Sequence, residues 1–242
     1  MEVTYHVLSD KGSRQKNEDR VGTYEKDGSY CFVVADGLGG HGKGDVASRI
    51  VVDTCVEQFK EQGYSGYYMI DAFEISQENL LKEQQRIMMP EDVKTTLVLL
   101  CISEDKIEWG YIGDSRLYLF ENRKKVLHTL DHSVPQMLVN IGEITDSEIR
   151  RHPDRSHLLR AMGFEWKRPK YEISQVYEPK KGMAFLMATD GFWELVEDEE
   201  MEQCLKKAKD VHEWMKQMEQ IVIRNGNGQE MDNYSAIGVW IN

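Results

Sequence analysis

The sequence predicts an α+β fold in which antiparallel sheets are covered by helices. Seven apolar runs rich in β-type residues recur along the 242 residues, at 4–10, 30–36, 95–102, 107–114, 116–120, 183–190 and 234–241. Continuous apolar runs of this kind are typical of strands that are buried on both faces. Strict alternation of strand and helix, which marks parallel sheets, is absent, and this favours antiparallel sheets.

Three stretches have the spacing of helices with one apolar face, at 45–60, 69–87 and 198–224. Gly226 and Gly228 follow the third stretch and can end it. Thr145 and Glu148 form a capping box that predicts a further helix, which must be short because Pro153 soon follows. This short helix lies in an insert between two strand regions, and a connection of about thirty residues is usually functional or mobile.

Composition excludes several classes of protein. The chain has 30 basic and 42 acidic side chains, a net charge of −12, which disfavours non-specific binding to nucleic acid. No apolar run exceeds six residues, and the N-terminal MEVTYHV is not a signal sequence, so we expect a cytoplasmic protein without a membrane anchor. With five prolines and no flexible linker, residues 1–242 are expected to form a single domain.

Cysteine and histidine give no sign of a disulfide framework or a zinc site. The four cysteines are scattered without a CxxC pair, and each has apolar neighbours, as expected of buried thiols in a reducing compartment. The seven histidines include no HxxxH spacing.

Four aspartates stand at the ends of predicted strands: Asp36, Asp114 and Asp190 after three of them, and Asp232 before the last. A single Asp-Gly after a strand is usually only a turn. If the four strand ends converge, however, the carboxylates crowd together and need cations to stay ionised. Oxygen ligands without histidine or thiolate favour Mg²⁺ or Mn²⁺, and two such ions can activate water for phosphoryl transfer.

Two polar segments accompany these aspartates. DKGSRQKNED, from Asp10, brings Arg14 together with Glu18 and Asp19, and a guanidinium suits phosphate oxygens. DGLGGHGKGD, from Asp36, is rich in glycine, which lets a main-chain carbonyl approach an ion or a phosphate. Taken alone, the first segment would be interpreted as a solvated loop with mixed charges. The second lacks GxGxxG and a GKS or GKT ending, so a dinucleotide site or a P-loop is only weakly indicated.

These segments, in this order, resemble the metal-dependent protein phosphatase family, type 2C, and above all its bacterial stand-alone branch. The resemblance covers almost the whole chain and includes SDKGSRQKNED, VVADGLGGHGKGDVAS, GYIGDSRLYLF, HPDRSHLLRAMG, FLMATDGFWELV and DNYSAIGVW. It implies a four-layer α-β-β-α sandwich of two antiparallel sheets, with a flap insert at about 134–163. Lys94 stands where the family usually has glycine, and Ser235 where threonine is common.

The resemblance also implies roles for individual residues. Two Mn²⁺ or Mg²⁺ ions, and a weaker third, would be held by Asp36, the Gly37 carbonyl, Asp190, Asp232, Glu18, Asp19 and, for the third ion, Asp114. Arg14 would bind the phosphate. Metal-activated water would hydrolyse phosphoserine or phosphothreonine without a covalent intermediate, and His41 is a candidate for the acid that protonates the leaving group.

The flap insert suggests how substrates are chosen. Arg150, Arg151, Arg155 and Arg160 are either a solvated basic surface or contacts for acidic residues beside the phosphate. The substrates would be phosphoproteins, with a cognate serine/threonine kinase as a further partner. Two alternatives remain: a phosphoprotein-binding module without turnover, and a metallo-phosphoesterase that acts on small phosphates.

Overall fold

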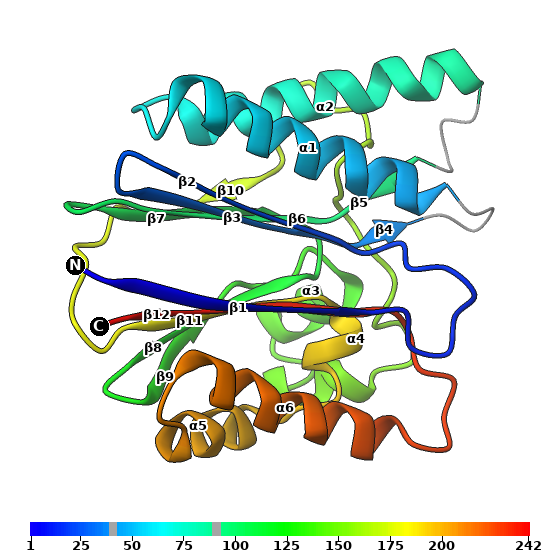
Figure 1. Cartoon of the computed structure of the whole chain (residues 1–242). Coiled ribbons are helices and arrows are strands. Elements are labelled where there is room, and N and C mark those ends of the chain that lie inside the picture. The colour runs from blue at the N-terminus through cyan, green and yellow to red at the C-terminus, as the bar shows by residue number, and fades with distance from the viewer. Residues whose placement is uncertain (39–42, 89–92) are drawn as a thin grey trace.

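Two five-stranded sheets lie face to face, and helices cover the outer face of each sheet, which gives four layers (Figure 1). The computed structural model describes residues 1–38, 43–88 and 93–242. Both sheets are antiparallel throughout. The expected α-β-β-α sandwich is confirmed.

The first sheet joins the two ends of the chain. Its strand order is β1-β12-β11-β8-β9. β1 pairs along its full length with β12, so the first and last strands lie side by side (Figure 1). The strands are β1 Val3–Asp10, β8 Arg116–Glu121, β9 Lys124–His128, β11 Ala184–Ala188 and β12 Tyr234–Ile241.

The second sheet has the order β10-β7-β6-β3-β2. Its strands are β2 Arg20–Lys26, β3 Ser29–Ala35, β6 Leu97–Ile102, β7 Ile107–Ile112 and β10 Glu172–Ile173. A separate two-stranded ribbon pairs β4 Gly37–Leu38 with β5 Lys94–Thr95. All seven predicted strands are present, and the run at 95–102 is divided between β5 and β6.

Apart from the two-residue β4, three of the strands in the described residues were not predicted from the sequence: β2, β9 and β10. Each lies at the edge of its sheet and carries polar residues, because an edge strand is less completely buried than a central one. The Asp27-Gly28 turn between β2 and β3, with φ of 51° and 74°, was the available signal for the first hairpin.

The apolar runs are continuous because each face of a central strand meets its own core. In β3, Cys31 and Val33 pack against the helices, whereas Phe32 and Val34 pack against the other sheet. β11 divides in the same way, with Leu186 toward the helices beneath the first sheet. The inference from the sequence that strands are buried on both faces is confirmed for these central strands, whereas β1, at the edge of the first sheet, is only partly buried.

Helices α1 Gly44–Gln62 and α2 Tyr68–Ile87 cover the second sheet, close to their predicted bounds (Figure 1). The single helix predicted at 198–224 was wrong, because α5 Asp198–Lys207 and α6 Val211–Gly226 cover the first sheet as two helices. Ala208 is extended, and Asp210 caps α6 by accepting a 2.8 Å hydrogen bond from the Glu213 N–H.

The flap insert contains α3 Val134–Asn140, which was not predicted, and the short 3-10 helix η1 Asp146–Arg151. η1 begins with the predicted capping box, in which the Thr145 N–H donates to the Glu148 carboxylate at 2.7 Å. Within the described ranges, no helix is both long and apolar enough to cross a membrane.

Candidate active site

The predicted aspartates gather where the two sheets meet at one end of the sandwich. Asp36 follows β3 and Asp114 follows β7, both in the second sheet. Asp190 begins the one-turn helix α4 Asp190–Trp193 after β11, and Asp232 precedes β12, both in the first sheet. Arg14, Glu18, Asp36, Gly37, Asp190 and Asp232 all line one cavity of about 370 Å³. The sandwich therefore brings together side chains that are far apart in the sequence.

The carboxylates raise one another's pKa values. Asp36 keeps part of its surface open to the cavity, yet burial, followed by the charges of Asp19 and Asp190, raises its pKa well above the usual range. Burial also raises the pKa of Asp19 to about 7. Burial and then the charge of Asp190 raise the pKa of Asp114 strongly. This concentration of negative charge is what a bound cation would relieve.

The main chain at Asp36 is held firmly. The Asp36 carbonyl accepts hydrogen bonds from the Thr95 hydroxyl at 2.7 Å and the Thr96 N–H at 2.8 Å. The Asp36 N–H donates to the Thr96 hydroxyl at 2.9 Å. At Gly37 a Cβ would lie 2.3 Å from the carbonyl of Gly44, so only glycine fits between the Asp36 strand and the start of α1.

A second set of hydrogen bonds holds Asp19. The Thr189 hydroxyl donates to Asp19 Oδ2 at 2.9 Å and accepts from the Ser235 N–H at 2.9 Å. Ser235, the residue that departs from the family's usual threonine, is also bonded through its hydroxyl to Ser9 at 2.9 Å. The serine thus keeps a hydroxyl group at this position, and that hydroxyl is hydrogen-bonded.

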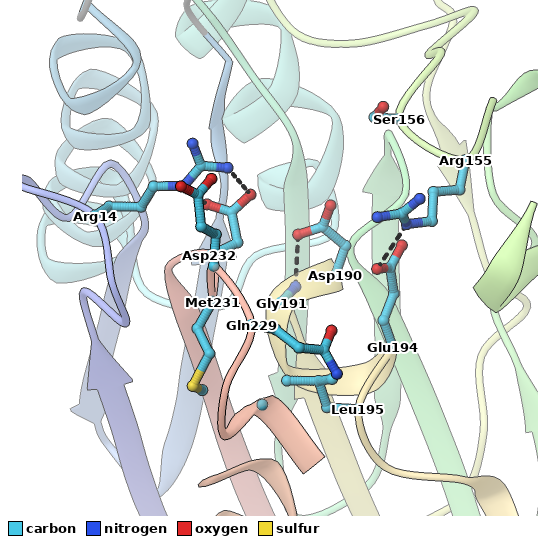
Figure 2. Close-up of a pocket in the computed structure, with 12 residues that line it drawn as sticks. Arg14, Arg155, Ser156, Asp190, Gly191, Glu194, Leu195, Gln229, Met231 and Asp232 are labelled. Carbon is cyan, nitrogen blue, oxygen red and sulfur yellow. Dashed lines mark hydrogen bonds and ion pairs between the residues drawn. The ribbon is translucent and has the colours of Figure 1, made fainter. Parts of the chain in front are cut away.

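Arg14 reaches across to Asp232 (Figure 2). Its Nε and Nη2 donate to the two carboxylate oxygens, each at 3.0 Å, and both side chains are about half exposed. The hydrogen bond to Asp232 raises the pKa of Arg14. The guanidinium therefore lies in the cavity beside the carboxylates.

Asn233 is a residue of the site whose role the sequence did not reveal. Its side-chain oxygen accepts from the Glu18 N–H at 2.7 Å, and its amide nitrogen donates to the carbonyls of Lys11 and Lys16 at 3.0 and 2.9 Å. Asn233, the residue after Asp232, therefore holds the loop that carries Arg14 in place by hydrogen bonds. In the sequence, only the Asp-Asn pair before β12 pointed to Asn233.

The donor set fits hard divalent cations. Asp19 Oδ1 and Asp114 Oδ1 are buried oxygens without a hydrogen-bond partner, and such atoms are costly unless a cation or water meets them. As the side chains lie, no three or more His, Cys, Asp or Glu residues in the described ranges form a ready-made metal site. Both oxygens of Asp232 accept hydrogen bonds from Arg14, which leaves each a further lone pair.

The four flap arginines have different surroundings. Arg150 is buried, donates to the Trp193 carbonyl and pairs with Asp198, so it is part of the framework. Arg151 is exposed and pairs with Glu197 at 2.9 Å, whereas Arg160 is half-buried and pairs with Glu172 at 3.6 Å.

Arg155 is the flap arginine next to the carboxylates. It pairs with Glu194 at 3.0 Å and lines, with Ser156, Asp190 and Arg14, a second cavity of about 280 Å³ (Figure 2). Burial, followed by the charge of Asp190, raises the pKa of Glu194 to about 7. Arg155 therefore faces the site from the side opposite to Arg14.

Two residues singled out in the sequence remain. His41, the candidate acid, lies outside the described residues. Lys94 is buried in β5, opposite Leu38 of β4, and its ammonium group lies 4.1 Å from the centre of the Phe164 ring. The lysine that replaces the family's usual glycine thus packs toward the flap.

Comparison with known proteins agrees with this geometry. A family model described as "Protein phosphatase 2C" matches residues 9–233. The chain is 32% identical over 215 residues to the serine/threonine phosphatase stp of Listeria monocytogenes, covering 85% of this chain and 84% of the relative. It is 30% identical over 228 residues to the serine/threonine protein phosphatase PstP of Mycobacterium tuberculosis, covering 93% of this chain and 43% of that protein.

Solved structures agree in fold. The serine/threonine phosphatase Stp1 of Staphylococcus aureus superposes with a TM-score of 0.88 at 27% identity, over 100% of this chain and 96% of the other. The catalytic domain of PstP in complex with two manganese ions superposes with a TM-score of 0.80 at 25% identity, over 99% of each chain.

Proposed function

The chain belongs to the protein phosphatase 2C family and is a serine/threonine protein phosphatase, and we propose that it hydrolyses phosphoserine and phosphothreonine by direct attack of water in a Mn²⁺ or Mg²⁺ centre. This proposal rests on the set of mutually repelling carboxylates that lies beside Arg14. Two of the buried carboxylate oxygens have no hydrogen-bond partner. No residue is assigned as a covalent nucleophile.

The ligands are proposed residue by residue. Asp36 lies centrally, since the charges of Asp19, Asp190, Asp114 and Asp232 all act on it, and it would bridge two ions. Asp190 and Asp232 would complete one site; the Gly37 carbonyl, Glu18 and Asp19 would serve the other. Asp114, with Asp190, would hold a weaker third ion. Bound ions would supply an activated water and positive charge for the phosphoryl oxygens.

The chain's own residues bind and orient the substrate. Arg14 presents a planar fork of donors, and on phosphate binding it would exchange Asp232 for phosphate oxygens. The leaving alkoxide needs a proton, and His41 is proposed for that role, with a water on the third ion as the alternative.

Arg155 is the flap residue that we propose as a substrate contact, because it lines the cavity that contains Arg14 and Asp190. Arg151 and Arg160 are proposed as outer contacts. Arg150 is buried among protein partners, and its proposed role is to hold the flap. The phosphoprotein substrates, a kinase that forms them and a cytoplasmic location remain part of this proposal.

The proposal is tested with p-nitrophenyl phosphate and a phosphothreonine peptide, in Mn²⁺ and in EDTA. Asp36→Asn and Asp190→Asn should each lower kcat at least a hundredfold, whereas Asp53→Asn, an exposed control on α1, should match the parent. Absence of metal-dependent turnover would leave a phosphoprotein-binding module. Turnover of the small phosphate alone would indicate a different phosphoesterase.

A further inference from the structure

The two acids proposed for the third ion lie beside the ends of two paired strands. Asp114 lies in the link 113–115 between β7 of the second sheet and β8 of the first, and Asp190 follows β11, whose Ala188 pairs with Arg116 of β8. Main-chain hydrogen bonds fix these strand ends, but the link that contains Asp114 lies outside the ladder. The position of Asp114 within this link therefore depends also on side chains that bridge it to neighbouring elements.

Trp193 makes such a bridge. Its indole Nε1–H donates to the main-chain carbonyl of Asp114 at 3.0 Å. Trp193 also belongs to α4, the single helical turn that Asp190 begins, and its N–H is bonded to Thr189, the residue before Asp190. The short helix α4 thus begins with Asp190 and also donates a hydrogen bond to the main chain of Asp114.

The indole ring has little freedom to move. Trp193 is 1% exposed, and the guanidinium carbon of Arg116 lies 3.6 Å from a ring centroid. Arg116 is itself fixed by two hydrogen bonds to the buried carboxylate of Asp131, at 2.7 and 2.8 Å. On the flap, Arg150 lies 5.3 Å from the ring and donates to the Trp193 carbonyl.

We propose that Trp193 is a positioning residue that sets Asp114 relative to Asp190, with Arg116 holding the indole plane. The inference rests on the proposed metal centre, but it concerns this chain's own framework. A ligand whose support is removed binds its ion less well, commonly by about 10–100-fold in affinity or activity. Loss of the indole N–H should therefore weaken the Mn²⁺ site that uses Asp114 and leave the rest of the site in place.

The competing explanation is that Trp193 is only a large core side chain, since it packs in the cluster beneath the first sheet. Trp214 of α6 provides a matched control in the same cluster. It is also fully buried, and its Nε1–H donates to a main-chain carbonyl, that of Met201, at 3.2 Å. Its partner Met201 belongs to α5, whereas the partner of Trp193 is the proposed ligand Asp114.

The experiment compares Trp193→Phe with Trp214→Phe in the full chain. Urea unfolding measures stability, calorimetry measures Mn²⁺ binding, and a phosphothreonine peptide gives kcat and KM as functions of Mn²⁺ concentration. Both variants should lose stability. Only Trp193→Phe should require about tenfold more Mn²⁺ for its weakest site and for half-maximal kcat, with KM at saturating Mn²⁺ unchanged. Indistinguishable Mn²⁺ titrations of the two variants would overturn the inference.

Arg116→Lys keeps a positive charge beside Asp131 and removes the planar group over the ring. Arg116→Lys should shift the Mn²⁺ titration in the same direction as Trp193→Phe. If Trp193→Phe does not fold, the titration of Arg116→Lys tests the inference in its place. An unchanged titration in Arg116→Lys would then overturn the inference. If the parent itself shows no Mn²⁺-dependent turnover, the proposed function fails; if the parent is Mn²⁺-dependent and only the tryptophan result is negative, the proposed function stands.

Discussion

Asn233 connects the loop of Arg14 to the strand that follows Asp232. Its side chain is 6% exposed and meets three main-chain groups of residues 11–18. A buried group that loses its partner costs about 1–3 kcal/mol, so such a side chain fixes a loop that would otherwise sample several positions. The geometry of Arg14 therefore depends on a neutral residue that holds its loop as well as on the charge of Asp232.

Asn233→Ala is therefore expected to loosen Arg14 without removing any proposed ligand side chain. KM for a phosphothreonine peptide should rise about tenfold or more, because an interaction of about 1.4 kcal/mol with phosphate corresponds to a factor of ten. Stability measured by urea unfolding should fall by about 1–3 kcal/mol.

Asn79→Ala is the control for this change. Asn79 donates from its side chain to Thr54 at 3.1 Å, between the two helices over the second sheet. It should lose stability with KM unchanged. Equal KM values for the parent and Asn233→Ala would contradict the assigned role.

Among the elements, the flap insert is the part of the fold that brings an arginine to the site from outside the sheets. Arg155 lies after η1, and its partner Glu194 follows α4, so the two elements meet at the rim of the cavity (Figure 2). Because Arg155 is about half exposed, its attraction for a substrate should be screened by salt.

Arg155→Ala is expected to lower kcat/KM several-fold for a phosphopeptide with acidic residues beside the phosphothreonine. The loss should shrink as ionic strength rises from about 0.01 to 1 M, since the screening length falls from about 30 to 3 Å. Activity on p-nitrophenyl phosphate should change less. Arg168→Ala, an exposed arginine that lines neither cavity of the site, is the control. A salt-independent loss would refute electrostatic recognition by Arg155.

In the whole molecule, acidic side chains are concentrated at the end of the sandwich that contains the proposed active site, and the folded chain must bury them close together. Asp19, Asp36, Asp114 and Asp190 all have raised pKa values, with burial as the first cause in each. A carboxyl with a higher pKa in the folded state binds more protons there than in the unfolded chain, so its contribution to stability decreases as pH rises.

In EDTA, the free energy of unfolding is expected to decrease between about pH 4, the ordinary carboxyl value, and pH 7, where Asp19 titrates. Mn²⁺ supplies the positive charge that protons supply at low pH. The increase in Tm on adding Mn²⁺ should therefore be larger at pH 7.5 than at pH 5.5. Asp36→Asn should show a flatter pH profile in EDTA. A stability in EDTA that does not change from pH 4.5 to 7.5 would contradict this account.

Central elements were predictable from the sequence because their chemistry is local. β3 and β11 are apolar without interruption since both faces are covered, and such runs can be recognised in the sequence. β2, β9 and β10 could not be recognised in this way, because an edge strand needs fewer apolar residues. The division between α5 and α6 was missed because the apolar spacing continues across the short break at Ala208.

For the site, the sequence by itself determined which residue types are present: acids at strand ends, an arginine after the first strand, and glycine where the chain must pass close to itself. Motif order was enough to indicate the family. Only the tertiary structure showed which of these groups meet, because β3 and β7 belong to one sheet and β11 and β12 to the other, and the two sheets face each other across a shared core. The structure also distinguishes the buried Arg150 from the exposed Arg155. It identifies Asn233 and Trp193 as supports of the site, which the sequence could not show, since hydrogen bonds between distant segments leave no periodic pattern in a sequence.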